Sequence, residues 1–217
     1  MLVCAVLLAG QASAPQQKQA QPATDEWTAA FDGNALDTTK WERFSFEGGN
    51  GGTFNVSGGQ LQMRAIPGSR CGVRTRRKFS GQRFIVEAML AKVGPPLPEP
   101  NTPGLPPGFA NLTVLFDDSG RNRVEWIYTS DNRFEAWAVV DGVSERLDNR
   151  NLATKIANPN LGIVRRGDDF MFMLNGQMGL QRTVKRLPRD FWVMLYGYGS
   201  SENAWTSARV VTLKEGQ

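Results

Sequence analysis

The chain contains no histidine among its 217 residues. This absence excludes the Ser-His and Cys-His pairs that activate many nucleophiles, and it removes the most frequent zinc ligand. Only two cysteines are present, Cys4 and Cys71. Cys4 falls in an expected export signal, so a lone Cys71 could form no internal disulfide. We expect Cys71 to be a small buried hydrophobic residue, and we expect no metal site and no cofactor.

Neither charge nor hydropathy is concentrated in the way that nucleic-acid binding or membrane insertion requires. The 25 basic and 21 acidic residues give a net charge of +4, which is too small to indicate a nucleic-acid partner. No apolar run reaches the roughly 18 to 20 residues that span a bilayer. We therefore expect no nucleic-acid binding and no transmembrane segment.

The N-terminal segment has the composition of an export signal. An apolar stretch at residues 2–10 is followed by the small residues Ala12, Ser13 and Ala14. We predict a signal peptide over residues 1–14, a polar linker over 15–24 and one domain over 25–217. The expected location is therefore secreted or periplasmic. The alternative is a disordered apolar N-terminus.

Alternation of apolar and polar residues, broken by turn signals, dominates the rest of the chain. Asp141-Gly142 and Asn175-Gly176 are pairs that favour tight hairpins. Only the stretch 149–157 could hold a short helix, and the proline-rich stretch 94–108 is expected to be a loop. The pattern predicts an all-β, two-sheet antiparallel β-sandwich. Its strands are expected at 27–31, 53–57, 60–65, 71–79, 83–93, 110–117, 122–128, 133–140, 143–147, 160–166, 169–174, 178–184, 191–197 and 205–213.

Several phrases resemble concanavalin A-like lectin/glucanase domains. They are Phe31-Asp32-Gly33 with Leu36-Asp37 and Trp41, the hairpin at 53–63, the strand at 80–88 and the late hairpin at 161–176. This resemblance covers most of residues 27–213 and implies a jelly roll with a concave, often glycan-binding face. A weaker resemblance, through the Phe-Asp-Gly and Trp opening, is to the 3-keto-disaccharide hydrolase domain family. Laminarinase-type members carry Glu-x-Asp-x-x-Glu, and no glutamate here has an aspartate two positions later. Hydrolysis of ordinary β-glucans by that motif is therefore not expected.

One hairpin is the first candidate for a sugar-binding surface. If residues 129–132 form a simple turn, Tyr128 opposes Arg133 and Trp126 opposes Glu135. Trp126, Tyr128, Arg133, Glu135 and Trp137 then share one face. Aromatic rings could cover sugar rings while Glu135 and Arg133 bond hydroxyls. The alternative is that both tryptophans belong to the core, with Glu135 and Arg133 at its rim.

Two further segments offer candidates. In residues 191–198 the aliphatic set suits the core, which leaves Tyr196 and Tyr198 for an exposed face; the alternative packs both tyrosines between the sheets. Six basic residues without an acidic one lie between positions 70 and 83. Arg74, Arg76 and Lys78 would align on one strand face. They could meet anionic sugars, or they could form a solvated outer strand whose charges resist edge pairing.

These observations favour an exported module that binds an oligo- or polysaccharide through an aromatic and carboxylate face. The first alternative is a glycoside hydrolase or lyase of the 3-keto-disaccharide hydrolase type, with Glu135 as the first candidate base and Glu87 as the second. The second alternative is a structural or adhesion module. An enzyme needs two carboxyl groups in one cleft, about 5 to 10 Å apart.

Overall fold

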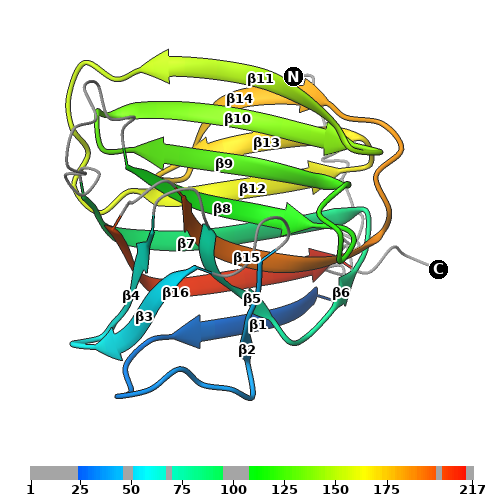
Figure 1. The fold of residues 1–217 in the computed structure, drawn as a ribbon. Coiled ribbons are helices and arrows are strands. Elements are labelled where there is room, and N and C mark those ends of the chain that lie inside the picture. Colours follow the sequence, from blue (N-terminus) through cyan, green and yellow to red (C-terminus); the bar gives the residue numbers. More distant parts are fainter. Residues whose placement is uncertain (1–23, 46–50, 67–69, 95–107, 199–201, 214–217) are drawn as a thin grey trace, which may run out of the picture.

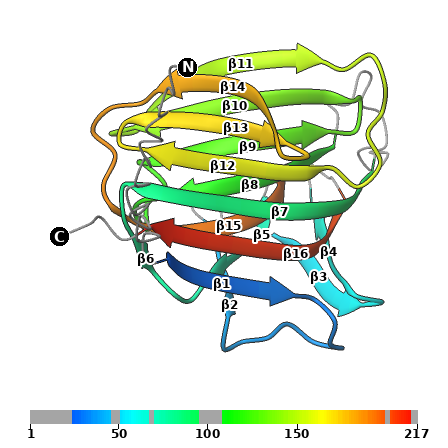
Figure 2. The same cartoon turned by 180° about the vertical axis from the view of Figure 1, so that it is seen from behind.

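The computed structural model describes residues 24–45, 51–66, 70–94, 108–198 and 202–213. Across these residues the chain is all β, and two antiparallel sheets pack face to face (Figures 1 and 2). The predicted two-sheet sandwich is therefore confirmed. None of the described residues forms a helix of the length and apolarity that a membrane span requires. The predicted signal and linker lie outside the described residues except for Thr24, and so does nearly all of the proline-rich stretch 94–108.

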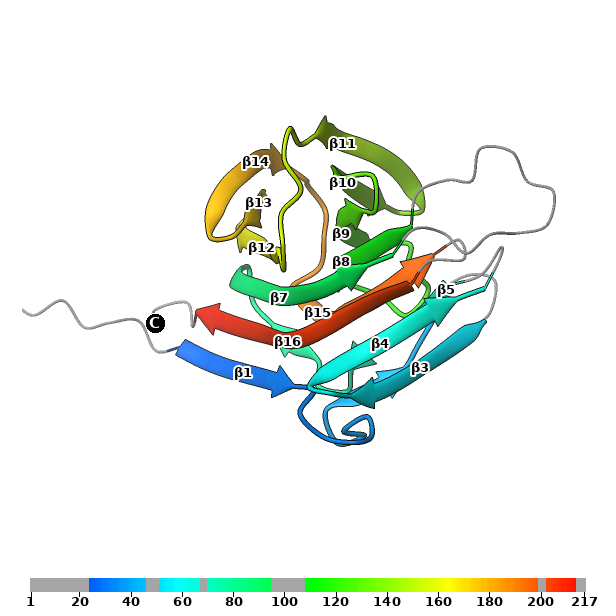
Figure 3. The same cartoon turned by 90° about the vertical axis from the view of Figure 1, so that its left-hand side faces the viewer.

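Sheet A, as described, has eight strands, of which the first, β1, pairs with β16 beside the main path. In spatial order the path is β14 (Gln177–Thr183), β13 (Asp169–Leu174), β12 (Asn160–Arg166), β7 (Arg83–Val93), β16 (Glu202–Leu213), β4 (Gln60–Ala65) and β3 (Gly52–Ser57), with β1 at Thr24–Ala30. Figure 3 shows β7, β16, β4 and β3 side by side.

Sheet B also has eight described strands, and its short β6 pairs with β15 beside the main path. In spatial order the path is β11 (Val143–Asn151), β10 (Arg133–Val140), β9 (Arg123–Thr129), β8 (Phe109–Leu115), β15 (Asp190–Tyr198), β5 (Arg70–Thr75) and β2 (Trp41–Arg43), with β6 at Phe79–Ser80. Most expected strands match these bounds. The short helix allowed at 149–157 is absent, because β11 continues to Asn151 and the described residues after it are irregular.

The core lies between the sheets and is built from one side of each strand. In β7, for example, Phe84, Val86 and Leu90 are buried while the alternate residues point away. Phe84 of sheet A meets Phe191 of sheet B with ring centroids 4.2 Å apart. Period-two burial of this kind fixes which side chains each sheet turns outward, and therefore which are available to a ligand.

The hairpin that carries the candidate surface has a different register from the predicted one. Phe134 pairs with Tyr128, and Trp137 pairs with Glu125. The turn is shorter than expected because Asn132 adopts a positive φ of 65° and its N–H donates to the Thr129 carbonyl. Asn tolerates this left-handed conformation, which permits a three-residue turn. A shift of one residue moves every side chain of one strand to the other face relative to its partner.

Two short strands also depart from the prediction. The expected strand at 71–79 is divided into β5 and β6, and both pair with β15. The three-residue β2 was not predicted, and it pairs with β5. Since β5 therefore lies between β15 and β2, it is not an edge strand.

Candidate functional site

The face of sheet B that points away from sheet A carries both polar and aromatic side chains. We call it the sheet B outer face. Its residues alternate with core residues along four neighbouring strands. They are Trp192, Met194, Tyr196 and Tyr198 on β15; Phe109, Asn111, Thr113 and Leu115 on β8; Arg123, Glu125, Ile127 and Thr129 on β9; and Arg133, Glu135, Trp137 and Val139 on β10.

A buried carboxylate lies near the centre of this face. The Tyr196 hydroxyl donates to Glu125 Oε1 at 2.5 Å, and Arg123 Nε donates to the same oxygen at 2.8 Å. Glu125 is only 5% exposed and Tyr196 only 3%. Burial and the negative charge of Glu125 hold the pKa of the Tyr196 hydroxyl well above its usual value. The hydroxyl therefore stays protonated and keeps the carboxylate oriented.

A second carboxylate lies beside it on β10. Trp137 Nε1 donates to Glu135 Oε2 at 2.9 Å, and Arg133 Nη2 lies 3.4 Å from Glu135 Oε1. Glu125 pairs with Trp137, so Glu135 is its diagonal neighbour across the two strands. Diagonal neighbours have Cα atoms about 7 to 8 Å apart. The sheet thus brings two glutamates to one face, and each has an arginine beside it.

Three buried polar atoms of this face have no hydrogen-bond partner among the described residues. They are Asn111 Oδ1, Thr113 Oγ1 and Arg133 Nε. Asn111 pairs with Tyr196 and Thr113 with Met194, so both lie between β15 and the glutamates. Buried polar groups in folded proteins are nearly always bonded. Their burial places these atoms beneath the face, out of contact with solvent.

Aromatic side chains with partial exposure flank the buried polar centre. Trp137 is half-buried, with the Arg146 guanidinium 5.8 Å from its ring centroid. Tyr198, on the opposite side, is 41% exposed and has Arg70 at 5.1 Å from its ring. A face with polar groups in the middle and accessible aromatic rings at its margins can contact both the hydroxyls and the apolar faces of a sugar.

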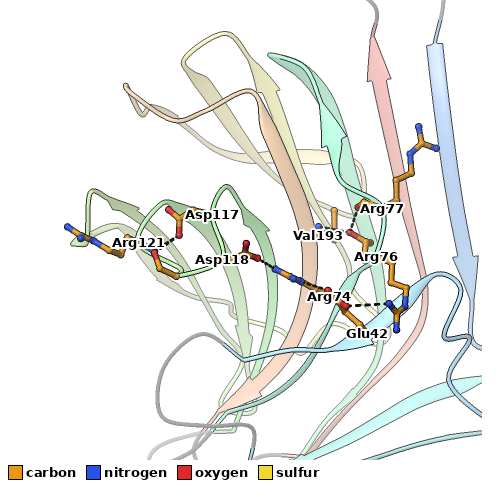
Figure 4. A network of polar contacts seen from close by, with 10 residues as sticks. Glu42, Arg74, Arg76, Arg77, Asp117, Asp118, Arg121 and Val193 are labelled. Carbon is orange, nitrogen blue, oxygen red and sulfur yellow. Dashed lines mark hydrogen bonds and ion pairs between the residues drawn. The ribbon is translucent and has the colours of Figure 1, made fainter.

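Four cations of the basic segment 70–83 form ion pairs, and Figure 4 shows those of Arg74 and Arg76. Arg74 donates to Glu42 at 2.7 Å and pairs with Asp118, and its guanidinium lies 3.9 Å from the Phe44 ring centroid. Three more of the six cations form ion pairs: Arg76 with Glu42, Arg77 with Asp25 and Lys78 with Asp190.

The predicted arrangement of these cations is wrong in two respects. Arg74, Arg76 and Lys78 do not align on one strand face, because β5 ends at Thr75. The segment is also not a solvated outer strand, since β5 lies inside sheet B. Because four of its six cations already face carboxylates, the segment offers little free positive charge to an anionic sugar.

The structure separates the sugar-binding residues that were predicted on one face. Trp126 and Tyr128 are buried in the core, where both rings stack on Phe134 and Trp126 Nε1 donates to the Met173 carbonyl of sheet A. The prediction that they share a face with Glu135 and Trp137 is wrong, because the hairpin register differs by one residue.

The other predicted residues lie on the sheet B outer face, except for Glu87. Arg133, Glu135 and Trp137 are on the sheet B outer face, together with Tyr196 and Tyr198. The prediction that the aliphatic residues of β15 face the core is confirmed. The expectation that Tyr196 is exposed is wrong, because its side chain is covered by its neighbours on the sheet B outer face. Their role in binding stays a prediction.

Glu87 is the exception, and three other residues were missed. Glu87 is on the outer side of sheet A, where its carboxylate lies 3.1 Å from Arg209 Nη1. It cannot act in one site with Glu135. Glu125, Asn111 and Thr113 were not predicted. Glu125 could have been found from the correct hairpin register, because that register pairs it with Trp137. The register follows once Asn132 is placed in the left-handed conformation.

Cys71 is fully buried, as predicted, and its Sγ lies 3.4 Å from the Thr53 carbonyl. Burial raises the pKa of its thiol.

Asp117 organises the β8–β9 turn, accepting hydrogen bonds from the Ser119 hydroxyl and from the Arg121 N–H. Within the described ranges, no three Cys, Asp or Glu side chains gather as metal ligands.

Comparisons with known proteins identify the fold. No protein-family model matches the chain, and no curated protein sequence matches it. Among solved structures, the Bacillus licheniformis β-glucanase is similar with a TM-score of 0.67 at 9% identity, over 90% of this chain and 100% of that one. The endo-β-1,3-glucanase of Pyrococcus furiosus is similar with a TM-score of 0.65 at 14% identity, over 88% of this chain and 94% of that one. The carbohydrate binding module CBM66 of Bacillus subtilis is similar with a TM-score of 0.57 at 12% identity, over 79% of this chain and 96% of that one. The chain therefore has the concanavalin A-like jelly-roll fold that the resemblance implied.

Proposed function

We propose that the protein binds an oligo- or polysaccharide on the sheet B outer face. The observation that supports this most directly is the Trp137–Glu135 pair. An accessible indole ring is held by its own N–H to a carboxylate at 2.9 Å. The ring can stack on the apolar face of a sugar while Glu135 and Arg133 bond the hydroxyls at its edge.

Other residues of the face support the same ligand surface. Asn111 and Thr113 are buried, so they lie beneath this surface and do not touch the ligand. Tyr196 and Arg123 hold Glu125 in place and so act as positioning residues. Tyr198 adds a second accessible ring at the far margin. Such preorganised groups lower the entropic cost of binding a flexible glycan.

The similar structures are consistent with this proposal. Their printed names describe β-glucanases and a carbohydrate binding module. A saccharide partner and no nucleic-acid partner fit that fold. We also propose that the protein is exported, to a secreted or periplasmic location. This rests on the composition of residues 1–14 and on the polysaccharide ligand itself.

A second candidate function is glycoside hydrolysis or lysis on the same face. It is favoured by the two glutamates, Glu125 and Glu135, on neighbouring strands. Catalytic carboxyl groups of glycosidases lie about 5 to 10 Å apart, and two residues that are diagonal neighbours in a sheet, about 7 to 8 Å apart, are close enough to provide such a pair. Binding is the better supported function, since each carboxylate already faces an arginine. Chemistry on a 3-keto glycoside would need only one base, for which Glu135 is the candidate. A structural or adhesion role would use none of these groups.

The test of the binding proposal is calorimetric titration with soluble β-glucan, mannan and xylan oligosaccharides. Trp137→Ala should raise the Kd by about 5- to 150-fold, corresponding to the loss of about 1 to 3 kcal/mol for a stacking anchor. Met178→Ala, at an exposed residue of β14, is the control and should leave the Kd unchanged. Unaltered affinity in Trp137→Ala would place the ligand elsewhere.

The enzymatic alternative is tested with plain and 3-keto glycosides. Loss of turnover in Glu125→Gln and Glu135→Gln, with activity kept in Glu87→Gln on the opposite sheet, would establish the two-carboxylate site. Binding without turnover of any substrate would support the binding function alone. Turnover that survives the first two substitutions would contradict the residue assignment.

A further inference from the structure

A pocket on sheet A, far from the Trp137–Glu135 pair in the fold, is built from four strands. It lies over β3, β4, β16 and β7, which run side by side in Figure 3. Its volume is about 320 Å³, at the lower end of the range of about 300 to 1,000 Å³ for small-molecule sites. A pocket of this size can take a short saccharide segment.

A small residue between long ones creates the hollow. Ala204 of β16 pairs with Gln62 on one side and with Lys92 on the other. Ala204 is buried, whereas the Gln62 and Lys92 side chains stand exposed on either side of it. Because outward side chains of neighbouring strands stand roughly parallel, a short central side chain leaves a trough between two tall walls.

The walls of this trough, which we call the sheet A pocket, offer both donors and acceptors. Glu202 Oε1 lies 3.8 Å from Arg64 Nε, and its Oε2 lies 3.8 Å from Lys92 Nζ. Both separations exceed a hydrogen-bond length, so the donors of the two cations can bond a ligand. The amides of Asn55 and Gln62, paired across β3 and β4, add a donor and an acceptor each.

This mixture fits hydroxyl groups better than it fits an anion. A sugar hydroxyl both donates and accepts, so adjacent hydroxyls match an alternation of guanidinium, carboxylate and amide groups. Glu202 lies between the two cations and offsets part of their charge, so an anion gains less there than it would from the two cations alone. Phe54 alternates with Asn55 along β3 and packs against the core, so the pocket is lined mainly by polar side chains.

We propose that the sheet A pocket is a second saccharide-binding site, specific for neutral sugars with vicinal hydroxyls. Gln62, Arg64 and Glu202 bond the hydroxyls, Lys92 and Asn55 bind at the two sides, and Ala204 forms the floor. The two sites lie on opposite sheets, so one molecule can hold two separate stretches of glycan. Binding through both sites raises the apparent affinity for a long polysaccharide above that of either site.

The experiment is a ¹⁵N NMR titration of the folded protein with laminarihexaose, cellohexaose and mannohexaose, and with a chondroitin sulfate hexasaccharide as the anionic probe. We expect a neutral probe to shift the backbone amides of residues 53–64 and 202–204. These shifts should persist in Trp137→Ala. Gln62→Ala and Arg64→Ala should each raise the Kd of this site by about tenfold, since hydrogen bonds to a charged or amide group are lost. Both side chains are exposed, so neither change should unfold the protein.

Gln181→Ala is the matched control, because Gln181 is an exposed glutamine at the opposite edge of the same sheet. Ala204→Leu should abolish binding at the sheet A pocket while every polar group remains. Shifts around Trp137 without shifts at the sheet A pocket would overturn this inference and leave the proposed function standing. Shifts at the sheet A pocket without shifts around Trp137 would support this inference and contradict the proposed function. A response only to the sulfated probe, or to none of the four, would also overturn the inference.

Discussion

Tyr196→Phe is the sharpest test of the buried network beneath the sheet B outer face. The substitution removes one oxygen and keeps the ring, so the apolar burial on β15 is unchanged. It deletes the 2.5 Å hydrogen bond to Glu125 and leaves the one from Arg123 Nε. A hydrogen bond to a charged group contributes about 1.5 to 3 kcal/mol. We therefore expect the free energy of unfolding near neutral pH to fall by that amount.

The same variant should also change how stability depends on pH. Burial and the charge of Glu125 raise the pKa of Tyr196 in the folded state, whereas the unfolded chain keeps a value of about 10. The stabilisation is therefore fully present below about pH 10 and is lost as the pH rises from there toward the folded pKa. Above about pH 10, wild-type stability should fall more steeply than that of Tyr196→Phe, by up to about 1.4 kcal/mol per pH unit.

Urea denaturation at a series of pH values from 8 to 11 measures both effects. Tyr198→Phe, on the same face of the same strand but exposed, is the control and should give a smaller loss. A stability difference between wild type and Tyr196→Phe that is near zero, or that stays constant through pH 10 to 11, would refute the bond between this hydroxyl and the Glu125 carboxylate.

Three further substitutions test the fold by urea denaturation. Gly72→Ala would place a Cβ 2.6 Å from Tyr196 Cβ, so we expect a loss of about 1 to 3 kcal/mol from overpacking. Arg165→Met removes the donors to the Gly167, Leu187 and Pro188 carbonyls from a fully buried side chain. We expect the free energy of unfolding to fall by more than about 1 kcal/mol, and a smaller fall would show that these hydrogen bonds do not stabilise the fold. Asn132→Gly should be more stable than Asn132→Ala by about 1 to 2 kcal/mol, because only glycine adopts a φ of 65° freely; equal stability would argue against the three-residue turn.

Most of the fold could be predicted from the sequence because alternation and turn residues are local signals. In β15 one side of the strand is wholly apolar apart from a glycine, so its orientation followed directly from the pattern. The three-residue β2 is too short to show a period of two. The division between β5 and β6 was not visible, because the basic residues after Thr75 continue the strand-like composition.

The candidate site could be predicted only in part, and the β9–β10 hairpin shows why. Both faces of β9 contain large apolar residues, Trp126 on one and Ile127 on the other, so the pattern cannot decide which face is inside. The turn decides, and its length depends on the conformation of a single residue, Asn132. The burial of Asn111 and Thr113 without partners among the described residues follows from three-dimensional packing and leaves no local signal.

The central claim is that a saccharide binds against Trp137 on the sheet B outer face. The most direct measurement is the indole N–H signal of Trp137 in a ¹⁵N NMR titration with neutral hexasaccharides, assigned by its loss in Trp137→Phe. Because this N–H bonds Glu135 at 2.9 Å, a sugar that contacts either group should shift it. We predict a saturable shift of the Trp137 signal, while the signals of the buried Trp126 and Trp205 stay in place. A binding isotherm with no change at Trp137 would contradict the account.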